Sequence, residues 1–196
     1  MCGMNSEYCE VVIEGSIDCI RGFVVGFLEG RGIRGEAIFE EDHHVANESK
    51  FGQMMRLIGV KGDRFHLIIG VGFRRLIETA LERRKDELGL KIISERKIKQ
   101  ASFVFHYRAY TKELGDELRA LFGDLTEGLR VSDYKPSETL LPEGKGIEAY
   151  APLHDYEIKA TGTIYGPAKE VIDFYGEAEH HDMVKLESIQ LEYDEI

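Results

Sequence analysis

The sequence predicts an α+β fold built from two ferredoxin-like βαββαβ halves, each with an antiparallel sheet and helices on one face of that sheet. Strand-like and helix-like hydrophobic patterns follow one another along the 196 residues in the order βαββαβ and again βαββαβ. Long polar loops occur at equivalent places, near 42–62 and 134–153. The triplets Leu90-Lys91-Ile92 and Val184-Lys185-Leu186 end the two halves in a similar way. These echoes indicate an internal repeat.

The first half opens with a strand and a helix. Apolar and polar residues alternate over Tyr8–Glu14, which is the period of a half-buried strand. Ser16 is a good N-cap for an amphipathic helix over 17–28. A second strand is predicted near 35–41, and a short helix at 51–58 inside the first polar loop.

The first half continues with a buried strand at 65–69, a helix at 73–88 and a strand at 90–99. Gly89 is the expected C-cap of that helix, because glycine adopts the left-handed conformation without strain. The predicted core stripe of the helix consists of Phe73, Leu76, Ile77, Ala80, Leu81 and Leu88.

The second half begins with the strongest strand pattern of the chain, 101–109. Thr111 is expected to cap a helix that ends at Gly123, and a short strand is expected at 129–133. The proline-containing stretch 134–153 is predicted to be a loop.

The last elements are a strand at 156–161, a helix and a strand at 184–193. Gly162-Thr163-Ile164 resembles Gly15-Ser16-Ile17, so it too is expected to open a helix after a strand. Pro167 suits the first turn of that helix, and Gly176 is expected to end it.

Two partitions of these elements are possible. The tandem arrangement places the halves at 1–99 and 100–196. The nested arrangement takes 64–134 as one central βαββαβ domain with short connections, flanked by two terminal βαβ arms. Antiparallel sheets follow from both.

Composition excludes several functional classes. The formal net charge is −11, and the basic residues are interspersed with acidic ones, which argues against binding nucleic acid or an anionic membrane. No apolar run has the length of a membrane span. Three cysteines without C-x-x-C spacing indicate a reducing compartment. We therefore expect a soluble cytoplasmic protein, and we expect it to form homo-oligomers that cover open sheet edges.

Strand parity divides the polar residues by charge. The first half places a mostly acidic set on the polar face: Glu10, Glu14, Glu36, Glu40 and His66. The second half places a mostly basic set there: His106, Arg108, Arg130, Glu157 and Lys159. One hypothesis is that the two faces approach each other and form a charged ligand-binding cleft. The alternative is two ordinary solvated sheet surfaces.

Two histidine pairs lie among acidic residues. They are His43-His44, after Glu41-Asp42, and His180-His181, between Glu179 and Asp182. Imidazole and carboxylate groups together suit zinc, nickel or iron. Adjacent histidines on a strand or loop point apart, so a metal site needs both segments, or a second subunit, to converge. The alternative is that these are polar loop residues without a ligand.

The stretch Gly70-Val71-Gly72-Phe73-Arg74 resembles the strand-to-helix loop of acylphosphatases, which are also βαββαβ proteins. The resemblance covers about five residues. It implies that Arg74 and the loop backbone cradle a phosphate. The glutamine that the family has before this loop is replaced by Ile69, and its catalytic asparagine has no counterpart between Leu88 and Phe105. The resemblance therefore implies anion binding more than hydrolysis.

Three functions follow as hypotheses. The first is a module that binds a small anionic molecule or a metal in a cleft between the halves. The second is an acylphosphatase-like or other small hydrolase that uses Arg74 with His66 or His106. The third is a structural or protein-interaction oligomer without catalysis. No cofactor can be identified from the sequence; a divalent metal is the candidate.

Overall fold

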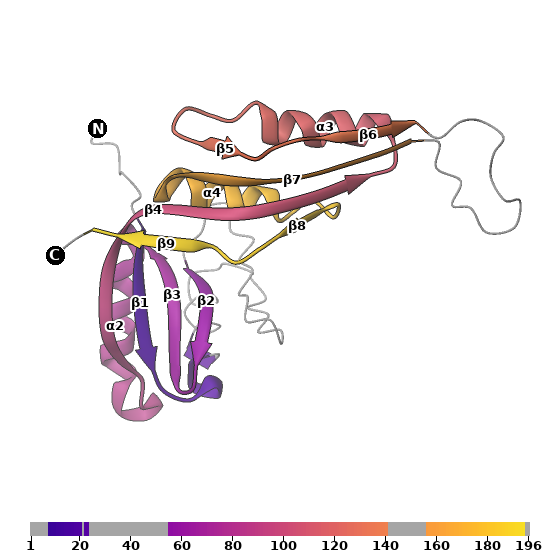
Figure 1. The fold of residues 1–196 in the computed structure, drawn as a ribbon. Coiled ribbons are helices and arrows are strands. Elements are labelled where there is room, and N and C mark those ends of the chain that lie inside the picture. Colours follow the sequence, from indigo (N-terminus) through magenta and orange to yellow (C-terminus); the bar gives the residue numbers. More distant parts are fainter. Residues whose placement is uncertain (1–7, 21, 24–54, 141–155, 195–196) are drawn as a thin grey trace, which may run out of the picture. The chain divides into compact units, whose positions relative to one another are not determined.

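The computed structural model describes residues 8–20, 22–23, 55–140 and 156–194 (Figure 1). These residues form a mixed α+β fold with antiparallel sheet strands and helices. The chain divides into two compact units, which we call unit 1 (Met1–Gln100 with Leu191–Ile196) and unit 2 (Ala101–Gln190). Unit 2 is therefore inserted in the chain between two parts of unit 1. No helix among the described residues combines the length and apolarity needed to cross a membrane.

Unit 1 contains an antiparallel sheet. Its strands are β1 (Tyr8–Glu14), β2 (Met55–Lys61), β3 (Arg64–Gly70) and the first part of β4 (Lys91–Ala109), in the spatial order β2-β3-β1-β4. Strand β9 (Gln190–Tyr193) also pairs with β4, and the backbone N–H of Asp194 donates to the carbonyl of Lys97 at 3.3 Å. A segment from the end of the chain thus completes a sheet that begins at its start.

The predicted caps Ser16 and Gly89 are confirmed in unit 1. Residues 17–20 and 22–23 are helical, and the Ser16 hydroxyl accepts a hydrogen bond from the backbone N–H of Cys19 at 3.2 Å. Helix α2 (Val71–Leu88) runs alongside the sheet in Figure 1. It ends at Gly89, whose φ of 61° is left-handed and whose N–H donates to the carbonyl of Lys85 at 2.8 Å.

The core of unit 1 lies between β1, β3 and α2. Cys9, Val11 and Ile13 of β1 pack in one cluster with Ile77 and Leu81 of α2. The opposite parity of β1 is buried as well, because Tyr8, Glu10 and Val12 are each at most 5% exposed. The expectation of a half-buried strand was therefore wrong: β1 is a central strand covered on both faces.

Two further predictions in unit 1 were wrong. The expected helix at 51–58 is contradicted by β2, which pairs with β3 across the two-residue turn at Gly62-Asp63. Gly62 has a φ of 63°, the conformation that such a hairpin turn requires. Leu76 is 45% exposed and lies outside the core stripe, because the buried stripe of α2 follows Ile77 and Leu81. The strand expected at 35–41 lies outside the described residues.

Unit 2 contains the last part of β4 together with β5 (Arg130–Ser132), β6 (Ser137–Leu140), β7 (Tyr156–Pro167) and β8 (Val184–Leu186). Strand β7 lies between β4 and β5. Strands β5 and β6 pair antiparallel with different parts of β7, and β8 pairs antiparallel with β4. Helices α3 (Lys112–Gly123) and α4 (Ala168–Ala178) connect these strands.

An aromatic core joins both helices of unit 2 to the same face of β4. The ring of Phe105 stacks on Phe122 of α3 with ring centroids 3.9 Å apart. The ring of Phe103, two residues earlier on β4, meets Tyr175 of α4 edge-on at 4.9 Å. Since Phe103 and Phe105 share one face of the strand, Val104 and His106 project from the other face.

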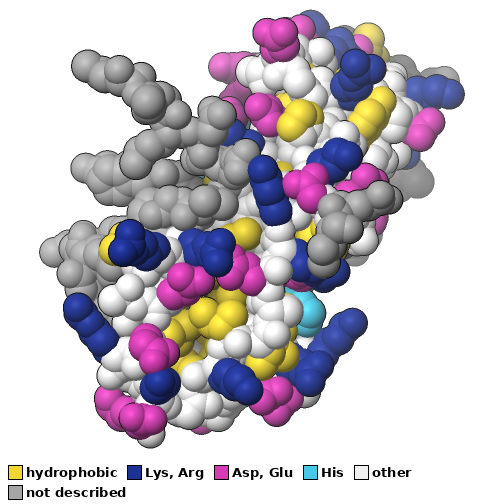
Figure 2. Space-filling view, turned by 90° about the vertical axis from the view of Figure 1, so that its left-hand side faces the viewer, with side chains coloured by type: hydrophobic (Ala, Val, Ile, Leu, Met, Phe, Trp, Pro, Cys, Tyr) yellow, Lys and Arg dark blue, Asp and Glu magenta, His cyan; other side chains and the backbone are white. Residues whose placement is uncertain are grey.

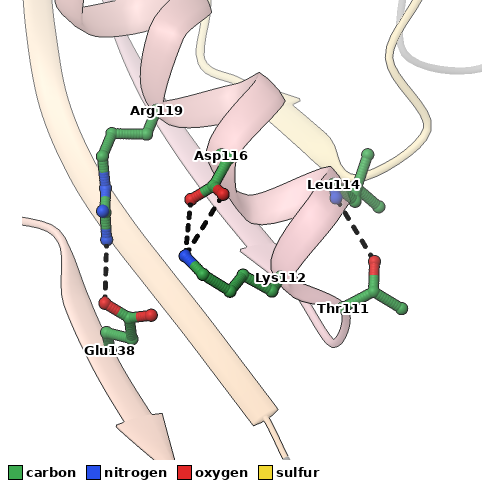
Figure 3. Close-up of polar contacts among 6 residues, drawn as sticks. All are labelled: Thr111, Lys112, Leu114, Asp116, Arg119 and Glu138. Carbon is green, nitrogen blue, oxygen red and sulfur yellow. Dashed lines mark hydrogen bonds and ion pairs between the residues drawn. The ribbon is translucent and has the colours of Figure 1, made fainter.

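Polar contacts position α3 at its start and along its length (Figure 3). The Thr111 hydroxyl accepts a hydrogen bond from the N–H of Leu114 at 3.3 Å, which confirms the predicted cap. Lys112 pairs with Asp116 one turn later at 3.2 Å. Arg119 donates to Glu138 of β6 at 3.2 Å and so links the helix to the sheet.

The strand boundaries of unit 2 differ from the prediction. A break was expected near Gln100, but Lys91–Ala109 is one continuous strand. Gly162-Thr163-Ile164 does not open a helix, because β7 extends to Pro167. A Cβ at Gly162 would lie 2.8 Å from the Phe105 ring, so the glycine permits close strand packing.

The elements around α4 also end elsewhere than predicted. Pro167 is the N-cap of α4 and not part of its first turn. The helix continues past Gly176 to Ala178, whose side chain is fully buried. The strand expected at 184–193 is two strands, β8 and β9, and both pair with β4.

Candidate functional site

Polar side chains gather on the face of the unit 2 sheet opposite α3 and α4. Phe105 and Tyr107 are buried, so His106 and Arg108 project from the opposite face of β4. Residues paired directly across antiparallel strands share a face, which places Lys185 of β8 beside His106. By the same rule Ser137 of β6 lies on the same face as Lys159 of β7.

Strands β7 and β4 meet next to His106. The Thr161 hydroxyl donates a hydrogen bond to the carbonyl of Phe105 at 3.1 Å. Thr161 and Lys159 have the exposed parity of β7, whereas Ile158 and Ala160 are buried. The polar residues of β8, β4, β7 and β6 therefore form a row across the sheet.

This row lines a concavity of about 560 Å³, which we call the basic concavity. Its basic residues are His106, Arg108, Lys135, Lys159 and Lys185, and Ser137 and Thr161 also line it. None of the described residues that line it is acidic. The clustering is notable in a chain whose formal net charge is −11. By contrast, Figure 2 shows a face on which basic and acidic side chains are interspersed.

Two of the basic residues have carboxylate neighbours just outside the concavity. His106 Nε2 lies 2.9 Å from Glu187 Oε1, and Arg108 Nε lies 3.7 Å from Glu157 Oε1. Both pairs are solvent-exposed, so each contributes little free energy. Their main effect is to orient the side chains of His106 and Arg108. Lys135, Lys159 and Lys185 form no ion pair with any carboxylate in the described part of the chain. No described carboxylate therefore neutralises their charges.

The structure brings together only part of the residue set predicted from the sequence. His106, Arg108 and Lys159 line the basic concavity, and Glu157 contacts Arg108 from beside it. Arg130 is on β5 opposite Tyr165 and does not line it. Sequence reasoning missed Lys135, Ser137, Thr161, Met183 and Lys185. The alternating pattern of 184–193 could have placed Lys185 on the polar face of a strand. Lys135 lies in a predicted loop, where no such pattern indicates the direction of a side chain.

His66 belongs to a buried cluster in unit 1. Its Nδ1 lies 3.1 Å from Oε1 of Glu10, a residue that is 3% exposed. Arg96 donates to Oε2 of Glu10, and its guanidinium stacks on the ring of Tyr193 at 3.7 Å. Burial alone would raise the pKa of Glu10, but hydrogen bonds from His66, Arg96 and Tyr193 outweigh it and hold that pKa below its ordinary value.

The same cluster perturbs Tyr193. Burial, followed by its hydrogen bond to Glu10, raises the pKa of Tyr193 to about 12. Every oxygen of the Glu10 carboxylate thus has a partner within unit 1. The cluster has the features of a structural network, in which both carboxylate oxygens are already hydrogen-bonded.

Arg74 lies at the start of α2, as the acylphosphatase resemblance requires, but it is engaged with acidic residues. Its Nε lies 3.1 Å from Glu78 Oε1 and also pairs with Glu95 of β4. The guanidinium that the resemblance assigns to phosphate binding is therefore already paired with two carboxylates. The N-cap residue Gly70 provides no side-chain cap.

Among the described residues, His180 and His181 belong to no group of three metal-ligating side chains. His180 and His181 follow α4, where their backbone N–H groups donate to the carbonyls of Glu177 and Ala178. Within the described ranges, no three His, Cys, Asp or Glu side chains lie close enough to hold a metal ion. His43 and His44 lie outside the described residues. Metal binding stays a prediction.

Comparison with known proteins leaves the chain without a family. No known protein family matches it. No curated protein matches it either. One similar solved structure is that of an unknown protein from Galdieria sulphuraria, with a TM-score of 0.27 and 16% identity over 97% of this chain and 99% of that chain.

A second solved structure is that of a protein proposed to be a glycine cleavage system transcriptional repressor. It has a TM-score of 0.24 and 10% identity, over 97% of this chain and 99% of that chain. At TM-scores this low, neither likeness bears on the fold or the activity of this protein. The geometry of its own side chains must carry any functional assignment.

Proposed function

We propose that this protein is a small-ligand-binding module and that the basic concavity of unit 2 binds an anionic molecule. One observation carries the proposal. Lys135, Lys159 and Lys185 line one concavity with Arg108 and His106, although the chain as a whole is acidic. Like charges held together repel one another, and a bound anion removes that repulsion.

The chemistry of the lining favours a carboxylate or a phosphate group. Lysine ammonium groups are strong point charges that bind either group, and the guanidinium of Arg108 can donate two parallel hydrogen bonds. The hydroxyl of Ser137 adds a neutral donor. A pair of unit charges 4 Å apart near a protein surface attracts by about 4 kcal/mol before the cost of desolvation.

We further propose that both units are ferredoxin-like halves. Unit 1 has the strand order β2-β3-β1-β4, with a helix after β1 and another after β3. Unit 2 follows the same plan, since β4 lies between β8 and β7, and β7 lies between β4 and β5. The division of the chain between Gln100 and Ala101 supports the tandem arrangement over the nested one.

The other hypotheses have weaker support among the described residues. A phosphate-ester hydrolase would need Arg74 free, but Arg74 pairs with Glu78 and Glu95. Homo-oligomer formation stays a prediction, which sedimentation of the purified protein would test directly. A cleft between the two units is likewise a prediction; the basic concavity lies within unit 2 and does not depend on it.

The test is a thermal melt with inorganic phosphate at constant ionic strength. We expect phosphate to raise the melting temperature of the unaltered protein and to have little effect on the triple variant Lys135→Gln, Lys159→Gln, Lys185→Gln. The matched control is Lys61→Gln, Lys91→Gln, Lys99→Gln, which removes the same charge from exposed lysines that do not line the concavity. Equal stabilisation of both triple variants would mean that phosphate binds elsewhere.

A further inference from the structure

The basic concavity is much larger than a single phosphate or carboxylate group. Its volume is about 560 Å³. Concavities of about 300–1,000 Å³ typically enclose an organic molecule of drug size. Met183, which is 44% exposed, adds an apolar side chain to the lining. The aliphatic stems of the lysines add more apolar surface between the charges.

The charges of the concavity extend from one side of the sheet to the other. Lys185 lies on β8, directly opposite His106 of β4. Ser137 lies on β6, directly opposite Lys159 of β7, and Lys135 precedes it by two residues. Strand β4 neighbours β7, so the row runs in the order β8, β4, β7, β6.

Strand spacing sets the length of this row. Neighbouring strands lie about 4.8 Å apart, so the three steps from β8 to β6 span about 14 Å. Lys185 stands at one end, and Lys135 with Ser137 stands at the other. A phosphate ion or a short carboxylate can neutralise one end only, and it leaves the cations at the other end unpaired.

Resting on the proposed function, we infer that the ligand is an elongated organic dianion, with two anionic groups about 10–14 Å apart joined by a largely apolar body. One anionic group binds Lys185 near His106, and the other binds Lys135 and Ser137. The body lies across β4 and β7 against Met183 and the lysine stems. Once one end is bound, the second contact is intramolecular, so it gains a high effective concentration.

The experiment is a calorimetric titration with a series of unbranched dicarboxylates at constant ionic strength: succinate, adipate, suberate, sebacate and dodecanedioate. Decanoate, which has the chain length of sebacate but only one charge, is the matched ligand. We expect affinity to rise with length and sebacate to bind about tenfold more tightly than both succinate and decanoate, an advantage of about 1.4 kcal/mol.

Variants at the two ends sharpen the test. Lys185→Gln and Lys135→Gln should each abolish the advantage of sebacate over decanoate, while Lys112→Gln, on the surface of α3, should leave it unchanged. If all dicarboxylates, decanoate and phosphate bind equally well, the proposed anion site stands and the two-ended ligand is wrong. If none of them binds, the proposed function fails as well.

Discussion

Arg96 donates two hydrogen bonds to a single carboxylate oxygen of Glu10, from Nε at 3.1 Å and from Nη2 at 2.7 Å. Glu10 is the charged side chain that the described core buries, and it lies on a strand covered on both faces. A buried carboxylate is tolerated only when its hydrogen-bonding capacity is met. The contact with Arg96, 86 residues away in the chain, therefore stabilises the buried carboxylate in the folded state of unit 1.

Replacement of that carboxylate should destabilise the protein. Glu10→Gln keeps the size of the side chain but leaves Arg96 and His66 without their charged partner. We expect a loss of about 2–3 kcal/mol in the free energy of unfolding, below the full cost of breaking a buried pair because Arg96 is half-exposed. Urea unfolding followed by circular dichroism measures it.

The control for this prediction is Glu192→Gln, a change of the same chemistry at an exposed position of β9. It should alter the free energy of unfolding by less than about 0.5 kcal/mol. A loss as large as that of Glu10→Gln would show that overall charge, and not the buried contact, controls stability.

The contribution of Glu10 to the free energy of unfolding should decrease as the pH falls. Its pKa in the folded protein lies below the ordinary value of about 4.3, so the unfolded chain takes up the proton first as the pH falls. The stability from this group is complete at neutral pH and is lost as the pH falls through the folded pKa. The stability difference between the unaltered protein and Glu10→Gln should therefore shrink below about pH 4.3.

Urea titrations at several pH values between neutrality and the acid limit of solubility measure this difference. Ionisable groups that do not contact Glu10 are the same in both proteins, so their contributions cancel in the comparison. A difference that stays constant down to low pH would mean that the pKa of Glu10 is the same in the folded and the unfolded protein, and so is not lowered by the buried contacts.

Substitution by alanine should have opposite effects on stability at two glycines of α3. A Cβ at Gly115 would lie 2.7 Å from the Tyr156 hydroxyl and 2.8 Å from Cγ2 of Ile158, so Gly115→Ala should cost about 1–3 kcal/mol. Gly123, in the same helix, has nothing within 4 Å of such a Cβ. Gly123→Ala should be neutral or stabilising by up to about 1 kcal/mol, because alanine favours the helix. Urea midpoints of both variants are compared; equal effects would contradict the packing argument.

The thiol of Cys9 should be nearly inert in the folded protein. Burial, with a smaller contribution from the charge of Glu95, raises its pKa to about 11. At pH 8 only about one thiol in a thousand is then ionised, and the thiolate is the reactive form. In the variant Cys2→Ser, Cys19→Ser, iodoacetamide should label Cys9 slowly in buffer and rapidly in urea. Rapid labelling in buffer would show that β1 opens readily.

Local signals could be predicted from the sequence because they need only neighbouring residues. Ser16, Gly89 and Thr111 cap their helices through contacts within four residues, and each prediction is confirmed. Strand β2 was mistaken for a helix because a short apolar run fits both periods. Pairing with β3 decides between them, and pairing partners are not visible in a local pattern.

In the candidate site, too, local patterns predict some residues, and strand pairing brings in the others. Parity along β4 and β7 correctly places His106, Arg108 and Lys159 on the polar face. Lys185 and Lys135 join them only through the pairing of β8 and β6 with their neighbours. Parity also assigned Glu10 to a polar face, but Arg96 and Tyr193 enclose it, and both come from distant parts of the chain.

The insertion of unit 2 within unit 1 has a consequence for biosynthesis. A ribosome produces β1 with Glu10 early, but it produces Tyr193 only after all of unit 2. A nascent chain therefore carries the carboxylate of Glu10 without its full set of partners while unit 2 is being translated. The carboxylate therefore gains its last partner, Tyr193, only when β9 pairs with β4.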